Sequence, residues 1–253
     1  MWYTLVVRRR DRMKLEEKKQ YVETNLKYLP AEEKKSYDFN FACVFTKNSV
    51  GMESGNTAKL EEVVSVIRGT SNHLDESLKR SIYNHYSSYL KMLDHLQATK
   101  GVLTEEDLKD IHSSLVYGVI EGGLYRNVNI RINGSHYIPC DHVKVYDRMK
   151  KYFAELNNMQ PDLDKACYAH LQLAKIHPFL DGNGRLSRLI LNYVLISLGY
   201  LPIQIPAKRR EEYFETLEAY KVEKTMEPFK KLLIELLNNE YDRLIELIEP
   251  FVK

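Results

Sequence analysis

The segment His177-Pro-Phe-Leu-Asp-Gly-Asn-Gly-Arg-Leu-Ser-Arg188 decides what fold and chemistry we expect of this chain. It contains a histidine, an aspartate, a Gly-Asn-Gly turn and two arginines, and an apolar helical pattern follows it directly. A flexible polar loop that leads into a helix N-terminus binds anions through its backbone N–H groups and the helix dipole. The segment therefore predicts a site for a polyphosphate.

The polar side chains of this segment suggest a division of roles. Asp181 is a suitable ligand for Mg²⁺, which prefers one or two carboxylates together with substrate oxygens. Arg185 and Arg188 are three residues apart on the first turn of the helix, where both can bind phosphoryl groups bidentately. His177 would then deprotonate an incoming hydroxyl. Each residue alone is typical of a helix cap or a solvated loop, so the prediction depends on their combination.

Composition limits the class of protein. The 253 residues are 44% hydrophobic and carry a formal net charge of only +2, which favours a soluble globular protein and argues against nucleic-acid or membrane partners. Cys43, Cys140 and Cys167 are far apart, which indicates neither a disulfide framework nor a zinc site and suits a reducing cytoplasm. No run approaches the roughly 18 apolar residues of a membrane span.

Apolar spacing near 3.6 residues predicts a mainly α-helical chain. The segment 48–57 is polar and contains glycines, so it is expected to be a break between helices. His112 shares the apolar face of the helix that begins after Thr104, which is typical of a hydrogen-bonded core histidine. Helices are expected at 12–28, 37–47, 60–67, 75–96, after Thr104, 143–156, 164–176, after the loop, 208–222 and 227–248.

One β-hairpin is predicted between Tyr125 and Pro139. Val128, Ile130 and Ile132 alternate with polar residues, and Asn133-Gly134 favours a type I′ turn. A single hairpin is only marginally stable. It either packs on the helices as a structural element or pairs its free edge with an extended peptide.

The segment 177–188 matches the Fic signature H-P-F-x-D/E-G-N-G-R-x-x-R at every defined position. The chain therefore resembles the Fic-domain family, whose usual activity is transfer of AMP from ATP to a Ser, Thr or Tyr hydroxyl of a target protein. The resemblance implies a Fic-type helical bundle with one β-hairpin flap. It further implies a helical region at 1–98 with a regulatory segment around 48–57, and a Fic core at 99–253, together forming one compact unit.

The resemblance also assigns roles to individual residues. His177 corresponds to the general base, Asp181 to the metal ligand, Asn183 and Gly184 to the anion hole, Arg185 to the phosphate ligand and Arg188 to the γ-phosphate ligand. The hairpin, with Ile130, Arg131, Ile132 and Ser135, resembles the flap that binds the target backbone. Tyr213 and Phe214 lie in a segment similar to the one that closes over the nucleotide base, although this chain has Lys221 where the family often has Asn.

A second resemblance concerns regulation. Ser49-Val-Gly-Met-Glu53 is similar to the S/T-x-x-x-E core of the inhibitory helix of some Fic proteins, in which the glutamate pairs with the second arginine of the loop, here Arg188. The pair would compete with the γ-phosphate for one guanidinium. Ser54 is an extra residue before Gly55-Asn56, so a shortened or tilted helix that holds Arg188 less firmly is expected. The alternative is that Glu53 is a solvated carboxylate.

These observations leave several functions open. The leading hypothesis is an autoinhibited, Mg²⁺-dependent protein adenylyltransferase that uses ATP and modifies a target protein or itself. The alternatives are a Fic enzyme that uses another nucleotide donor or removes AMP, and a regulatory module that binds nucleotide without turnover. A homodimer in the cytoplasm is compatible with each of them.

Overall fold

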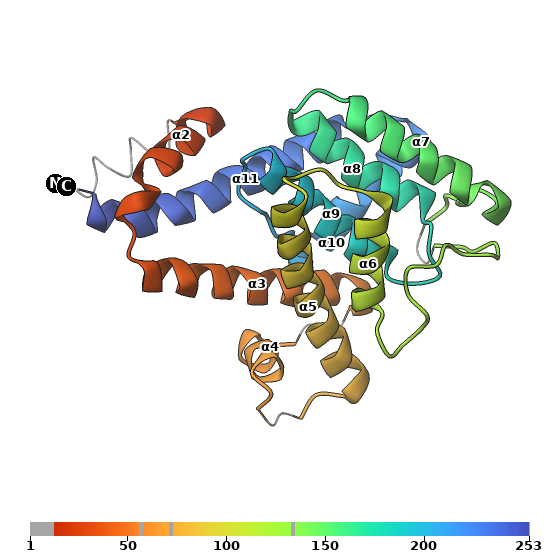
Figure 1. The fold of residues 1–253 in the computed structure, drawn as a ribbon, viewed down its shortest axis with the longest axis horizontal. Coiled ribbons are helices and arrows are strands. Elements are labelled where there is room, and N and C mark those ends of the chain that lie inside the picture. Colours follow the sequence, from red (N-terminus) through yellow and green to blue (C-terminus); the bar gives the residue numbers. More distant parts are fainter. Residues whose placement is uncertain (1–12, 56–57, 71–72, 133–134, 253) are drawn as a thin grey trace.

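The computed structural model describes residues 13–55, 58–70, 73–132 and 135–252 of the 253-residue chain. It is mainly helical, as predicted, and Figure 1 shows the helices wrapped around a central pair, α8 and α9. The helices are α2 (Leu15–Asn25), α3 (Ala31–Ser54), α4 (Leu60–Ile67), α5 (Glu76–Ala98), α6 (Glu105–Leu115), α7 (Val145–Asn158), α8 (Leu163–Ile176), α9 (Asn183–Ser197), α10 (Arg210–Val222) and α11 (Glu227–Ile248). Short 3-10 helices are at Leu26–Tyr28, His142–Lys144, Ala207–Arg209 and Glu249–Phe251.

Helix α9 is the centre of the bundle. Its residues from Leu186 to Leu195 are buried, and α3, α5, α6 and α8 all contact it. A helix that is apolar on nearly every side must be surrounded by others. Residues 177–182 connect α8 to α9, and the rest of the 177–188 segment is the start of α9, so the segment is held at both ends by the core.

The main hydrophobic core includes residues from both halves of the chain, for example Phe45 and Leu189. Helix α4 covers a smaller apolar cluster, formed with α3 and α5 around Cys43, Val63 and Ile82. A division at residue 98 therefore does not coincide with a gap in the main core, and the two-part organisation stays a prediction.

The expected break at 48–57 is wrong for residues 48–54. Helix α3 continues through Gly51 to Ser54 and ends at Gly55, whose φ of +66° is the left-handed conformation favoured by glycine at this position. A glycine inside a helix costs about 1 kcal/mol relative to alanine. The contacts of Ser49 and Glu53 described below compensate for that cost, while Asn56 and Thr57 lie outside the described residues.

The predicted hairpin does not appear as a strand pair. The described residues 125–132 and 135–139 form no strand, although the backbone N–H of Ser135 donates to the carbonyl of Ile132 at 3.2 Å. The Asn133-Gly134 turn lies outside the described residues. The physical reason is that an isolated two-stranded ribbon is marginal, and here the carbonyls of Val128 and Cys140 bond to a buried arginine instead. We call residues 128–140 the flap segment.

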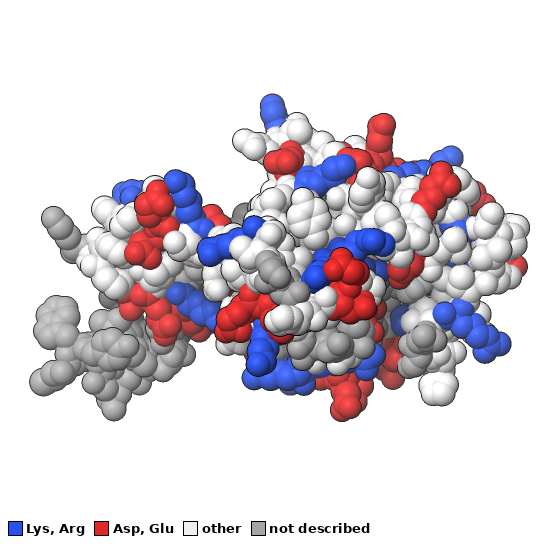
Figure 2. All heavy atoms as spheres, turned by 90° about the horizontal axis from the view of Figure 1, so that it is seen from below, with Lys and Arg blue, Asp and Glu red and all other residues white. Residues whose placement is uncertain are grey.

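No helix in the described part of the chain has the length and apolarity needed to cross a membrane. On the face shown in Figure 2, Lys and Arg are interspersed with Asp and Glu, and no large area of that face carries a single sign. Cys43, Cys140 and Cys167 are all free thiols.

Candidate active site

A cleft of about 440 Å³ lies at the start of α9. It brings together most of the residues singled out in the sequence: Glu53, Arg131, Ile132, Ser135, His177, Asp181, Asn183, Gly184, Arg185, Arg188, Tyr213 and Phe214. Ser49 and Ile130 do not line this cleft. Residues from α3, the flap segment, the α8–α9 loop and α10 thus meet at one place.

His177 ends α8 in a left-handed conformation, with φ +53° and ψ +60°. Its ring Nδ1 lies 3.3 Å from the carbonyl oxygen of Ala174. A carbonyl only accepts, so Nδ1 carries the proton of the neutral ring and Nε2 keeps its lone pair. Burial, with smaller contributions from Lys221 and Arg126, lowers the pKa of His177 to about 4, although the bond to Ala174 and the charge of Glu53 act in the opposite direction. The ring is therefore neutral at pH 7 and can accept a proton.

The loop after His177 is held by buried polar contacts. The side chain of Asn183 donates from Nδ2 to the carbonyl of Phe179 at 2.8 Å, and its Oδ1 accepts from the N–H of Phe179 at 2.9 Å. This use of the amide leaves the backbone N–H of Asn183, rather than its side chain, for the predicted anion hole. The aromatic ring of Phe179 is fully buried, as a loop anchor must be.

His112 supports the same loop from α6, and the prediction of a hydrogen-bonded core histidine is confirmed. It is fully buried, its ring stacks on Phe179 at 3.6 Å between centroids, and Gly123 N–H donates to its Nδ1 at 2.9 Å. Because Nδ1 accepts, Nε2 carries the proton and donates to the carbonyl of Asp181, also at 2.9 Å. His112 thus orients the backbone of Asp181.

The start of α9 has the features of an anion site. The first intrahelical bond runs from Leu186 N–H to the carbonyl of Gly182, so the N–H groups of residues 183–185 precede the helical ladder. The helix dipole adds positive potential there. A Cβ on Gly184 would come within 2.3 Å of Oε1 of Glu53, which shows how closely a carboxylate already approaches this position.

The two arginines of the loop have different partners. Arg185 Nη2 bonds to Oδ2 of Asp181 at 3.1 Å, whereas Arg188 Nη2 bonds to Oε1 of Glu53 at 2.6 Å. Arg188 also donates to the hydroxyl of Ser49 from Nε at 2.9 Å and to its carbonyl from Nη2 at 2.8 Å. Only 2% of the Arg188 side chain is exposed. The predicted contact of Glu53 with Arg188 is therefore present, Ser49 adds two further bonds to the same guanidinium, and the helix that supplies them is not shortened before Glu53.

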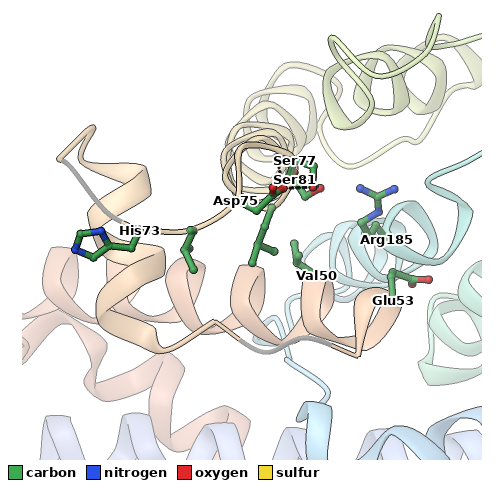
Figure 3. Close-up of a pocket in the computed structure, with 9 residues that line it drawn as sticks. Val50, Glu53, His73, Asp75, Ser77, Ser81 and Arg185 are labelled. Atoms are coloured by element: carbon green, nitrogen blue, oxygen red, sulfur yellow. Dashed lines mark hydrogen bonds between the residues drawn. The ribbon is translucent and has the colours of Figure 1, made fainter.

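A second cavity, of about 660 Å³, lies on the other side of Glu53 and Arg185 and is drawn in Figure 3. It is bounded by the end of α3, the segment before α5, and the first turns of α5. In Figure 3 the charged ends of Glu53 and Arg185 point in different directions, in agreement with their separate partners. These two residues form the partition between the two cavities.

One side of the cleft is closed by α10. Tyr213 is fully buried, with its hydroxyl 3.1 Å from Nε2 of His170, and Phe214 lies beneath the guanidinium of Arg210 at 4.5 Å. Lys221 is also buried, and its Nζ bonds to Glu218 at 3.0 Å. Glu218 in turn accepts a hydrogen bond from the hydroxyl of Ser135, so the flap segment is attached to α10 across the cleft.

Sequence reasoning missed several supporting residues, because their partners are backbone atoms or distant side chains. Arg210 Nε donates to the carbonyl of Met52 at 3.0 Å, which satisfies the C-terminal turn of α3. His170 joins the carbonyl of Ser187 to Tyr213. Arg126 is buried beside His177, whose carbonyl accepts a hydrogen bond from its Nε at 2.9 Å.

Comparison with known proteins agrees with this geometry. The model of the Fic/DOC family matches residues 102–195, which include His177, Asp181 and both loop arginines. The protein adenylyltransferase Fic of Drosophila grimshawi is 31% identical over 205 residues, which cover 77% of this chain and 41% of that protein. The chain belongs to the Fic/DOC family.

Other members of the family give the same picture. The protein adenylyltransferase Fic of Drosophila persimilis is 30% identical over 205 residues, covering 77% of this chain and 39% of that protein. This chain thus spans well under half the length of these curated relatives. A Fic-domain-containing signalling protein from Bacteroides thetaiotaomicron has the same fold, with a TM-score of 0.78, 21% identity, and coverage of 94% of this chain and 97% of that one. A Fic family protein from Desulfovibrio desulfuricans aligns with a TM-score of 0.76 at 24% identity, over 92% of this chain and 73% of that one.

Proposed function

We propose that this Fic protein is a protein adenylyltransferase that moves AMP from ATP to a hydroxyl of a target protein. The observation that carries the proposal is His177, a neutral histidine with Nδ1 occupied by Ala174, placed in the same cleft as a helix N-terminus and two arginines. The names of the curated relatives support AMP as the transferred group.

The reaction assigns one task to each group. Nε2 of His177 takes the proton of the target hydroxyl as its oxygen attacks the α-phosphorus of ATP. The bond from the α-phosphorus to the bridging oxygen breaks, and pyrophosphate leaves with the electron pair. The N–H groups at the start of α9, on Asn183 and Gly184, stabilise charge on the phosphate oxygens, and Arg185 binds the phosphate chain. Tyr213 and Phe214 form the wall of the cleft next to which the adenine of ATP would lie, and Phe214 is partly exposed.

Magnesium fits the donor set of the loop. Asp181 has a half-exposed carboxylate, and no group of three or more acidic, histidine or cysteine side chains in the described residues could hold a metal alone. A single carboxylate suits Mg²⁺, which completes its shell with water and phosphate oxygens. Asp181 would hold the ion, which would neutralise phosphate charge. Arg185, now paired with Asp181, would be released to the phosphates.

The flap segment is proposed to bind the target backbone next to His177. Arg131, Ile132 and Ser135 line the cleft, which supports this role, whereas Ile130 does not line it. The unpaired edge that such pairing requires is compatible with the absence of a strand ladder in the described residues of this segment. The acceptor is a hydroxyl of a target protein or of this protein itself. A cytoplasmic homodimer stays a prediction.

We further propose that Glu53 is an autoinhibitory residue, with Ser49 supporting it. Arg188 is required for the γ-phosphate in this reading, and it is already bound by one carboxylate, one hydroxyl and one carbonyl of α3. A phosphate must displace Glu53 to reach Arg188. The extended α3 and its Gly55 end support a firm contact rather than the loose one expected from the extra Ser54.

The test is incubation of the protein with Mg²⁺ and each α-³²P-labelled nucleoside triphosphate, comparing wild type, His177→Ala and Glu53→Gly. Covalent label from ATP that is strong in Glu53→Gly, weak in wild type and lost in His177→Ala is expected. Faster labelling from another nucleoside triphosphate would identify that nucleotide, and not ATP, as the donor. Retained nucleotide with no covalent label in any variant would favour the regulatory module, and release of AMP from pre-labelled protein would reveal the reverse activity.

A further inference from the structure

Arg126 is a buried cation that bonds to backbone carbonyls. It is 3% exposed, and among the described residues its side chain bonds to three backbone carbonyls and lies 3.7 Å from Sγ of Cys140. Its Nε donates to the carbonyl of His177 at 2.9 Å, Nη1 to that of Val128 at 3.1 Å, and Nη2 to that of Cys140 at 2.6 Å. Its own backbone N–H donates to the carbonyl of Pro178 at 2.9 Å. Placing a charge at this depth is costly unless it is fully hydrogen-bonded, so these contacts are a built arrangement.

The three carbonyls belong to the parts that must cooperate in the proposed transfer. Val128 and Cys140 are the two ends of the flap segment, and His177 is the proposed base. The guanidinium is planar and offers its N–H groups in a rigid fork. The positions of the three carbonyls are therefore not independent of one another, because one rigid group holds them all.

The backbone of His177 needs this support. A positive φ is uncommon for a residue other than glycine, and such a conformation persists only where surrounding contacts enforce it, at a cost of about 1–3 kcal/mol. Pro178 restricts the same residue from the other side. The N–H of His177 bonds to the carbonyl of Leu173 at 3.0 Å, which leaves its carbonyl to Arg126. Arg126 thus fixes the peptide that carries the imidazole.

We propose that Arg126 is a positioning residue that couples the flap segment to the general base. Seating of a target backbone on the flap segment is transmitted through one guanidinium to His177, so that the base is held for proton transfer when the flap is in place. Between these two ends, Ser135 bonds to Glu218 and attaches the middle of the flap segment to α10. The coupling rests on the proposed function, but the contact itself is measurable without any transfer reaction.

The test is Arg126→Lys, which keeps the charge and removes the fork, because one ammonium cannot reach three carbonyls in this geometry. NMR of the histidine rings, with His177 assigned by comparison with His177→Ala, follows its titration. We expect His177 to titrate near 4 in the wild type and closer to 6.5 in Arg126→Lys, since a loosened ring gains water. In a Glu53→Gly background, the self-labelling rate with ATP should fall about 10- to 100-fold, while the dissociation constant for ATP changes less than about twofold.

Two controls separate positioning from general damage. Arg148→Lys changes an exposed arginine of α7 in the same way and should leave both readouts unchanged. Asn129→Ala removes a different contact, in which the N–H of His142, just after the flap segment, donates to Oδ1 of Asn129 at 2.8 Å. This contact does not involve His177. Asn129→Ala should slow labelling and leave the pKa of His177 unchanged.

A folded Arg126→Lys protein whose His177 titrates as in the wild type would overturn the coupling, whatever its labelling rate. If that variant does not fold, hydrogen exchange in the wild type provides the test. The Nε–H of Arg126 must exchange slowly with solvent if it is bonded to the carbonyl of His177, and fast exchange would contradict the contact. Absence of labelling in every variant would refute the proposed function alone, since the titration and the exchange rate do not depend on it.

Discussion

The Oε1 atom of Glu53 lies 2.6 Å from Nη2 of Arg188 and 2.3 Å from the position that a Cβ on Gly184 would occupy. One carboxylate oxygen therefore faces both the guanidinium and the start of α9. A phosphate would bind to the same two features, a guanidinium and the N–H groups at a helix start. In the proposed reaction, a phosphate of ATP and Glu53 of α3 would therefore compete for a single anion position.

Glu53→Gly should raise the rate of AMP transfer several-fold or more and tighten ATP binding. A hydrogen bond between charged groups contributes about 1.5–3 kcal/mol, and each 1.4 kcal/mol corresponds to a factor of ten in an equilibrium. Because 41% of the Glu53 side chain is exposed, the lower part of that range applies. Transfer of label from α-³²P-ATP and calorimetric titration with ATP would measure the two effects.

The matched control for that substitution is Glu33→Gly, which changes an exposed glutamate in the first turn of the same helix. It places a glycine in α3 without touching Arg188, so its labelling rate should equal that of the wild type. Equal labelling by Glu53→Gly and Glu33→Gly would show that Glu53 does not restrain the site.

His177→Ala should reduce transfer by about 10²–10⁴-fold, the usual effect of removing a general base. The fold should be retained, because the 3.3 Å bond to Ala174 is the only side-chain hydrogen bond of His177 among the described residues, and the left-handed backbone costs alanine no more than about 1–2 kcal/mol. Circular dichroism and thermal unfolding would confirm the fold, and labelling would measure the loss. A folded variant that labels at the original rate would exclude His177 as the base.

Asn183→Ala should destabilise the protein by about 2–4 kcal/mol, because it leaves the N–H and carbonyl of Phe179 unsatisfied in a buried position. For a chain of this length that corresponds to a fall of roughly 4–16 °C in unfolding temperature. Asn238→Ala is the control, since it removes one bond to Ile234 on a partly exposed helix surface. If both variants unfolded at the same temperature, Asn183 would not be the brace of the loop.

The regular helices could be predicted because their information is local. Leu60–Ile67 is found where apolar spacing placed it, and Thr104 caps α6 as expected. Helix α3 could not be followed past residue 47, since Ser49 and Glu53 are stabilised by Arg188, which is more than 130 residues away in sequence.

The loop residues could be identified from their types and spacing, but their supports could not. Arg126 bonds to carbonyl groups, which every residue has, so no pattern of side chains indicates its partners. The alternation at Val128, Ile130 and Ile132 is a real β pattern, yet it does not produce a ladder among the described residues. The carbonyl of Val128 and the hydroxyl of Ser135 have partners outside the segment.

Stability should fall steeply as the pH is lowered from 7 to 5. Burial lowers the pKa of His170 to about 3 and of His112 and His177 to about 4, and it holds that of His85 well below its usual range. In the unfolded chain the same histidines titrate near 6.5. Below pH 6.5 these histidines therefore bind protons in the unfolded state but not in the folded state. Each one lowers the free energy of unfolding by up to roughly 1.4 kcal/mol per pH unit until its folded pKa is reached.

Urea unfolding at pH 7, 6 and 5 would measure how the free energy of unfolding changes with pH. His112→Gln should make this dependence shallower, even though that variant is less stable at pH 7. A free energy of unfolding that stayed constant or rose toward pH 5 would mean that these rings accept protons inside the folded protein.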